Sequence, residues 1–178
     1  MLAALLVAAP VGAQPALYVG MFTPHIGASA GGDIRERGVT PGVSLAVLDN
    51  NGIGAEVDLG HSRRVDADRF TGSAITSLMV NFQGMWMRLP VRPFVVVGAG
   101  LLRVRAETPE GIVFASRTDL GFNAGAGALY SFSDFVGVRG DVRYFRYFQR
   151  HDDLPLLDNG FFDFWRTSVG VTLSWSIQ

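Results

Sequence analysis

The stretch that decides the fold is VGVRGDVRYFRYF, residues 136–148. Its arginines and aromatic rings would suit a nucleic-acid surface, where cations hold phosphates and rings stack on bases. It also fits a β-strand with two different faces, because successive side chains of a strand point to opposite sides. The strand interpretation places Val136, Val138, Val142 and Tyr144 on one face, and Arg139, Asp141 and Arg143 on the other.

The composition of the whole chain argues against nucleic acid as a partner. The formal net charge is −1, and all 15 positively charged residues are arginines, whereas nucleic-acid-binding domains are usually strongly basic. The mean hydropathy is high, at +0.26, yet no apolar run reaches the roughly 18 to 20 residues of a membrane-spanning helix. Such a chain is either a soluble all-β protein or a membrane β-barrel. Cysteine is absent, which excludes disulfides and thiolate metal sites.

Alternating apolar and polar residues predict eight strands joined by connections of two kinds. Asn50-Asn51-Gly52 suits a tight hairpin, because Asn and Gly tolerate positive φ. Short and long connections alternate, which is typical of an outer-membrane barrel with short periplasmic turns and longer extracellular loops. The predicted strands are 16–23, 42–49, 53–60, 74–86, 93–106, 119–132, 136–148 and 166–177. The long connections are 24–41, 61–73, 107–118 and 149–163, and the short ones are 50–52, 87–92 and 133–135.

One face of each predicted strand is apolar and the other is small or polar. A soluble barrel, such as a lipocalin-like carrier, would turn the apolar face inward, whereas a membrane barrel turns it outward. The many Gly and Ser residues of the polar face favour the narrow interior of an eight-stranded membrane barrel. In the last strand Val169, Val171, Leu173, Trp175 and Ile177 oppose Ser168, Gly170, Thr172, Ser174 and Ser176.

Aromatic residues gather near both ends of the predicted strands. Two such bands are expected at the headgroup levels of a membrane barrel. The predicted periplasmic girdle contains Tyr18, Trp86, Phe94, Phe132 and Trp175, and the opposite girdle contains Tyr144, Tyr147, Phe148, Phe164 and Trp165.

The chain resembles a known family in YVGMF (18–22), PFVVVGAG (93–100), VGVRGDVRYF (136–145) and SVGVTLSWSI (168–177). These segments are similar to the small eight-stranded outer-membrane β-barrels of the outer-membrane-protein-A transmembrane-domain and OmpX/OmpW-like type. The resemblance covers residues 15–178. It implies residence in the outer membrane of a Gram-negative-type cell, both termini in the periplasm, and insertion by the barrel assembly machinery. We expect a monomer.

The first residues are typical of a secretory signal peptide. An apolar run, LAALLVAA (2–9), is followed by Pro10 and the small residues Val11-Gly12-Ala13, a pattern expected of the apolar region and cleavage site. A positively charged leader segment is missing, so we expect the true start to lie upstream of Met1. The predicted organisation is a signal peptide over 1–13 and a single barrel domain over 15–178.

Charged residues on the polar face are the strongest candidate site. Buried charges are costly unless they are paired, so in a lumen we expect an arginine–carboxylate network. Such a network is either a structural plug or part of a gate or ion path, and an eight-stranded barrel usually has no open channel. We therefore favour the plug. The residues are Glu56, Asp58, Arg139, Asp141, Arg143 and Arg166.

No catalytic, cofactor-binding or metal-binding residue is predicted. His25, His61 and His151 all fall in predicted long loops. His61 and Ser62 are adjacent, and neighbours on an extended chain point apart, which makes them a poor nucleophile–base pair. His151-Asp152-Asp153 is better explained as a solvated loop than as a metal site. GxSxG, HExxH, Walker A and Rossmann motifs are absent.

The predicted loops are the expected contact surface, since rigid scaffolds commonly present functional loops. Their arginines could bind lipopolysaccharide phosphates through paired hydrogen bonds, or simply solvate exposed turns. The sequence favours a non-enzymatic structural or surface-interaction protein. The alternatives are a small pore for ions or hydrophobic solutes, a lipid A hydrolase embedded in the barrel wall, and a soluble carrier. The candidate lipopolysaccharide contacts are Arg35, Arg37, Arg63, Arg64 and Arg69.

Overall fold

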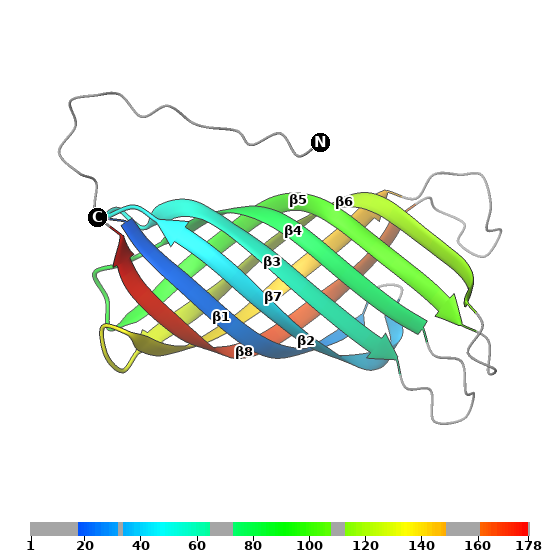
Figure 1. Cartoon of the computed structure of the whole chain (residues 1–178), viewed down its shortest axis with the longest axis horizontal. Coiled ribbons are helices and arrows are strands. Elements are labelled where there is room, and N and C mark those ends of the chain that lie inside the picture. Colours follow the sequence, from blue (N-terminus) through cyan, green and yellow to red (C-terminus); the bar gives the residue numbers. More distant parts are fainter. Residues whose placement is uncertain (1–17, 32–33, 65–72, 108–112, 149–160, 178) are drawn as a thin grey trace.

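Eight strands close into a single barrel in the computed structural model (Figure 1), which describes all residues except 1–17, 32–33, 65–72, 108–112, 149–160 and 178. Every strand pairs antiparallel with its sequence neighbours, and β1 closes the ring on β8. The strands are β1 (Tyr18–Gly31), β2 (Ile34–Leu48), β3 (Ile53–Arg64), β4 (Ser73–Met85), β5 (Val91–Glu107), β6 (Val113–Ser131), β7 (Val136–Phe148) and β8 (Phe161–Ile177). The predicted eight-stranded antiparallel up-and-down barrel is confirmed. Within the described residues, no helix is long and apolar enough to cross a membrane.

The two ends of the barrel differ (Figure 1). The turn end contains the first residue of β1, the last residue of β8 and the three connections 49–52, 86–90 and 132–135; the opposite end is called the loop end. The predicted hairpin after β2 is confirmed: Gly52 has φ of 83°, and Asp49 Oδ1 accepts hydrogen bonds from the backbone N–H groups of Asn51 (2.9 Å) and Ile53 (2.8 Å). The Ile53 N–H lowers the pKa of the exposed Asp49 carboxyl.

The predicted long connection 24–41 is wrong. β1 continues to Gly31 and β2 begins at Ile34, so only residues 32–33 separate the two strands. Gly residues are abundant in this polar stretch and, like Pro residues, are typical of loops. Inside a closed barrel they have other uses, because glycine leaves room for neighbouring side chains and Pro24 removes only one backbone donor. Pro24 stands in register with Val43 of β2.

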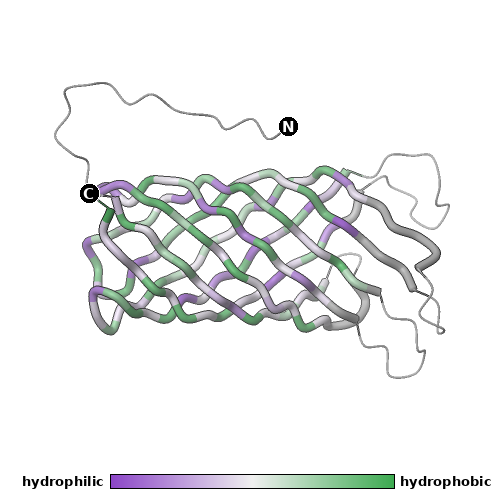
Figure 2. The backbone as a smooth tube through the Cα atoms, viewed as in Figure 1, coloured by the Kyte–Doolittle hydropathy of each residue, from purple (hydrophilic) through white to green (hydrophobic). Residues whose placement is uncertain are grey.

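Apolar side chains cover the outside of the barrel and polar ones fill its inside. Figure 2 shows hydrophobic and hydrophilic residues alternating along the strands. Outward-facing Leu120 and Val80 are 65% and 60% exposed, whereas inward-facing Glu56 and Asp58 are fully buried. A soluble barrel has the opposite arrangement. The exterior is therefore that of a barrel surrounded by lipid.

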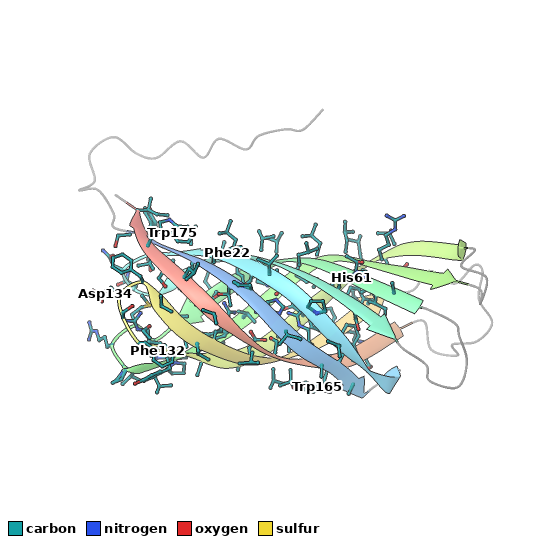
Figure 3. All side chains as sticks on the ribbon, turned by 60° about the horizontal axis from the view of Figure 1, so that its bottom comes forward. Phe22, His61, Phe132, Asp134, Trp165 and Trp175 are labelled. Carbon is teal, nitrogen blue, oxygen red and sulfur yellow. The ribbon has the colours of Figure 1, made fainter. Side chains whose placement is uncertain are left out.

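Some of the predicted girdle residues are on the outside and others are not. Figure 3 shows Trp175 and Phe132 near the turn end and Trp165 nearer the loop end. Tyr18, Trp86, Phe132, Trp175, Phe148 and Trp165 are exposed, and Tyr144 is partly exposed. Phe94, Tyr147 and Phe164 are between 0% and 4% exposed and belong to clusters inside the barrel, so their assignment to the girdles is wrong. The inside–outside alternation continues to the strand ends, and these three residues occupy inward positions.

Candidate functional site: the charged interior of the barrel

Strand β7 carries a column of alternating charges on its inward face. Arg139, Asp141 and Arg143 are two residues apart, so all three side chains enter the lumen. Arg143 donates to Asp141 from Nε to Oδ1 and from Nη2 to Oδ2, both at 3.2 Å. Ser168 of β8 donates to Asp141 Oδ1 at 2.8 Å. The negative charge of Asp141 is thus compensated by an arginine of the same strand.

The remaining positive charge of the two β7 arginines is compensated by a carboxylate on the opposite side of the barrel. β3 and β7 stand four places apart in a ring of eight strands, so they face each other across the lumen. Glu56 of β3 lies 2.6 Å from Arg139 Nη2 and 2.8 Å from Arg143 Nη1. Asn81 donates to Glu56 Oε1 at 2.9 Å, and Asn123 donates to Asn81 at 2.8 Å. The contacts of Glu56 with the two arginines, and of Asn123 with Asn81, connect strands that are not neighbours in the barrel.

Asp58 organises a second group of contacts beside the first. Its Oδ1 accepts from Arg166 Nη2 of β8 at 2.7 Å, and its Oδ2 lies 3.1 Å from His25 Nε2 of β1. The predicted position of His25 in a loop is wrong. β1 runs through Pro24, and inward alternation from Met21 reaches His25. This alternation was the signal that could have identified His25.

The structure brings all six predicted lumen charges into one network. Three arginines face three carboxylates, and no member is more than 7% exposed. The carboxylate oxygens face arginine, histidine, amide or hydroxyl groups, so the three buried carboxylates are paired rather than left open as ligands. Several guanidinium nitrogens of Arg139 and Arg166 form no hydrogen bond within the described residues. Within the described residues, no group of His, Asp and Glu could hold a metal ion.

Aromatic rings border the charged network on both sides. The Arg139 guanidinium lies 4.1 Å from the ring centroid of Phe94, towards the turn end. The Arg166 guanidinium lies 4.9 Å from that of Phe145, towards the loop end. Phe145 in turn stacks on Phe164, with centroids 4.9 Å apart and planes inclined by 8°. Cation–π contacts of this kind are strongest where water is excluded.

Inward glycines provide the room for these large side chains. A Cβ added at Gly125 would lie 2.7 Å from Arg143 Cγ, and one at Gly60 would lie 2.6 Å from Arg166 Nη1. A side chain at either position would force the arginines to move. The abundance of glycine on the polar face, noted in the sequence, therefore reflects tight packing in the lumen.

The other candidate residues lie outside this network. Arg35 and Arg37 belong to β2, and Arg63 and Arg64 are the last residues of β3, all towards the loop end. Arg69 and His151 fall outside the described residues, as does the predicted signal peptide.

His61 is also not in a loop, contrary to expectation, because β3 extends to Arg64. It faces outward and its Nδ1 lies 2.9 Å from Thr76 Oγ1, whereas Ser62 is buried inside. The two adjacent side chains thus point apart, as predicted.

Several solved structures share this fold. Neisserial surface protein A (NspA) is 15% identical with a TM-score of 0.63, covering 89% of this chain and 95% of that one. OprG from Pseudomonas aeruginosa is 9% identical with a TM-score of 0.59, covering 90% and 96%. Ail, the attachment invasion locus protein of Yersinia pestis, solved with the heparin analogue sucrose octasulfate, is 12% identical with a TM-score of 0.58, covering 91% and 100%. No curated protein sequence matches the chain.

The family is shown by a comparison that covers almost the whole sequence. The model of the outer membrane protein beta-barrel domain matches residues 1–176. The closed eight-stranded barrel with its apolar exterior agrees with that match. The chain therefore belongs to the outer membrane protein beta-barrel domain family, and its place is the outer membrane.

Proposed function

We propose that the protein is a closed, non-enzymatic scaffold of the outer membrane that presents its loop end at the cell surface. The observation that carries this proposal is the filled interior, in which a neutral arginine–carboxylate network lies between two apolar clusters. An ion crossing the barrel would have to displace both clusters and separate buried ion pairs. A filled interior favours a mechanical or surface role over transport.

The two apolar clusters occupy opposite halves of the lumen. The cluster at the turn end contains Met21, Ala46, Leu48, Met85, Phe94, Val96 and Leu129. The cluster towards the loop end contains Ile75, Met79, Leu102, Phe145, Tyr147 and Phe164. Tyr147 and Phe145 are fully buried, so aromatic rings close the lumen between the network and the loop end.

We infer an orientation with the turn end, and both chain termini, in the periplasm. Short turns at the periplasmic side are the general arrangement of outer-membrane barrels. This orientation places Arg35, Arg37, Arg63 and Arg64 on strand segments near the cell surface, where we propose that they meet lipopolysaccharide. A monomer is proposed because the closed ring leaves no unpaired strand edge. Insertion by the barrel assembly machinery belongs to the same proposal.

Planar-bilayer recording tests whether the barrel is closed. The purified full chain, with folding verified by heat-modifiable gel mobility, is added to a bilayer beside an open porin as positive control. The proposal expects no current steps above background under conditions in which the porin conducts. Reproducible steps that scale with the amount of folded protein would refute it.

A small pore is the second candidate, and one observation favours it. The Gln83 side-chain amide is fully buried, and neither its Oε1 nor its Nε2 has a partner within the described residues. Asn123 Oδ1 is likewise unpartnered. Buried polar atoms without protein partners commonly bind internal water. Conducting water in the lumen would produce current steps in the same recordings, whereas isolated water molecules would not.

Within the described residues, the hydrolase alternative concerns the pair His61 and Thr76 on the outer wall, and His151 lies outside them. A catalytic role would require the imidazole to activate the hydroxyl against a lipid ester. We propose that it does not. Mass spectrometry of lipid A from cells producing the wild type or His61→Gln is expected to show identical species. A modification that is present with the wild type and absent with the variant would establish an enzyme.

A further inference from the structure

A row of polar side chains crosses the outer wall of the barrel near the loop end. His61, Thr76, Arg103 and Thr118 lie on four adjacent strands, β3 to β6, and are successive cross-strand partners. Arg103 and Thr118 are exposed, and His61 and Thr76 are partly exposed. Figure 3 shows His61 in the half of the barrel nearer the loop end. Neighbouring strands are about 4.8 Å apart, so the row is about 14 Å wide.

A row of leucines lies directly beneath, one outward position closer to the turn end. Leu59, Leu78, Leu101 and Leu120 are also successive cross-strand partners on the same four strands. Their side chains are 42%, 43%, 43% and 65% exposed. The change from four leucines to four polar residues takes place over two residues, or about 7 Å along each strand. On each of these four strands, such a change is expected where acyl chains give way to headgroups.

The chemistry of the polar row suits an anionic headgroup. A guanidinium provides several N–H donors in a planar fork that matches phosphate oxygens. The two threonine hydroxyls and the imidazole on either side can hydrogen-bond sugar hydroxyls or further phosphate oxygens. The row itself contains no carboxylate. The Nδ1 contact with Thr76 at 2.9 Å holds the His61 ring in the row.

We propose that this row binds the phosphorylated sugar headgroup of an outer-leaflet glycolipid, whose acyl chains lie on the leucine row. The proposal rests on the orientation inferred above, which puts the loop end at the cell surface. The leucine row is continuous with the apolar exterior around it, including Val57, Val80 and Val97. This continuity favours a lipid over a protein partner. The site differs from the arginines of β2 and the end of β3.

Native mass spectrometry of the detergent-solubilised full chain, titrated with bisphosphorylated lipid A, tests the proposal. Arg103→Gln removes the cation and is expected to weaken binding about tenfold, as for the loss of a charge-assisted hydrogen bond. Thr76→Val keeps the side-chain shape, removes the hydroxyl that holds His61, and is expected to weaken binding severalfold. The matched control is Arg88→Gln, the same change in the turn-end connection 86–90, and its affinity is expected to stay within twofold of the wild type.

The same titration identifies the ligand. Lipid A with its phosphates removed is expected to bind no better than Arg103→Gln binds the intact lipid, and millimolar inorganic phosphate is expected not to displace the lipid. Equal binding of dephosphorylated lipid A, full displacement by phosphate, or equal affinity for phosphatidylglycerol would each overturn the proposal. An unchanged affinity of Arg103→Gln would do so as well.

Each variant is first checked for heat-modifiable gel mobility, so that an unfolded barrel is not mistaken for a lost site. The result is separate from the question of a closed lumen. If the barrel does not conduct but also does not bind lipid A, only the proposed lipid site is refuted. If the barrel binds lipid A but produces current steps, only the proposal of a closed scaffold is refuted.

Discussion

Replacing Glu56 by glutamine removes one negative charge from the barrel interior and nearly preserves the volume of the side chain. Glu56 is fully buried and lies 2.6 Å from Arg139 Nη2 and 2.8 Å from Arg143 Nη1. Three arginines would then face two carboxylates. Removing one partner of a buried ion pair typically costs about 3–5 kcal/mol, because the other charge is left uncompensated. We expect the free energy of unfolding to fall by that amount.

The structure also indicates which second substitution compensates. Arg143 keeps two contacts with Asp141 at 3.2 Å, whereas Arg139 keeps one, at 3.4 Å. Arg139 is therefore the less compensated charge in Glu56→Gln. The double variant Glu56→Gln/Arg139→Gln restores two charges of each sign and is expected to recover about 0.5–3 kcal/mol relative to the sum of the single losses.

Urea unfolding in lipid vesicles, followed by tryptophan fluorescence and heat-modifiable gel mobility, measures these changes. Asp134→Asn, the same loss of charge in the exposed connection 132–135, is the control and is expected to leave stability unchanged. The reasoning would be refuted if Glu56→Gln were as stable as this control. Strictly additive losses in the double variant would show that Glu56 and Arg139 do not interact energetically.

Two further predictions concern the aromatic cluster and the turn end. Phe145→Ala removes the ring between Arg166 and Phe164, and we expect a loss of about 3–5 kcal/mol in urea unfolding with no current steps, because the turn-end cluster and the charged network remain in place; a variant as stable as the wild type would show that this ring does not contribute to packing in the lumen. The Ile53 N–H lowers the pKa of Asp49 in the folded state. The ionised carboxylate therefore stabilises the fold at pH values above its unfolded-state pKa, and this stabilisation is lost as the pH falls through the lowered folded-state pKa. Asp49→Asn is expected to lack this part of the acid sensitivity when unfolding midpoints are compared from pH 6 to pH 3; identical pH profiles would contradict it.

Much of the fold could be predicted because its determinants are local. Alternation along β7 placed Arg139, Asp141 and Arg143 on the inward face without knowledge of any other strand. The turn at 49–52 could be predicted from Asn50-Asn51-Gly52 for the same reason, since the positive φ of Gly52 is a local requirement.

The features that were not predicted depend on where strands end and on how the ring closes. The sequence predicts that the first strand ends at residue 23, which leaves His25 in a connection, whereas β1 continues to Gly31. Tyr147 and Phe164 lie close to strand ends, which predicts a girdle position. Their places in the inside–outside alternation of β7 and β8 nevertheless turn both side chains into the barrel. The contact of Glu56 with Arg139 depends on the stagger of eight strands around the barrel, and no single strand contains that information.

The most direct test of a closed interior uses the absence of cysteine from the chain. A single thiol is introduced by Thr172→Cys, at an inward position that is 1% exposed, and, as a reference, by Asp134→Cys in the exposed turn. Folded protein in vesicles is treated with a small, charged, membrane-impermeant thiol reagent, and modification is followed by mass spectrometry. A closed barrel predicts that the Thr172→Cys thiol stays unmodified while the reference thiol reacts to completion. Comparable reaction rates at the two positions would contradict the account.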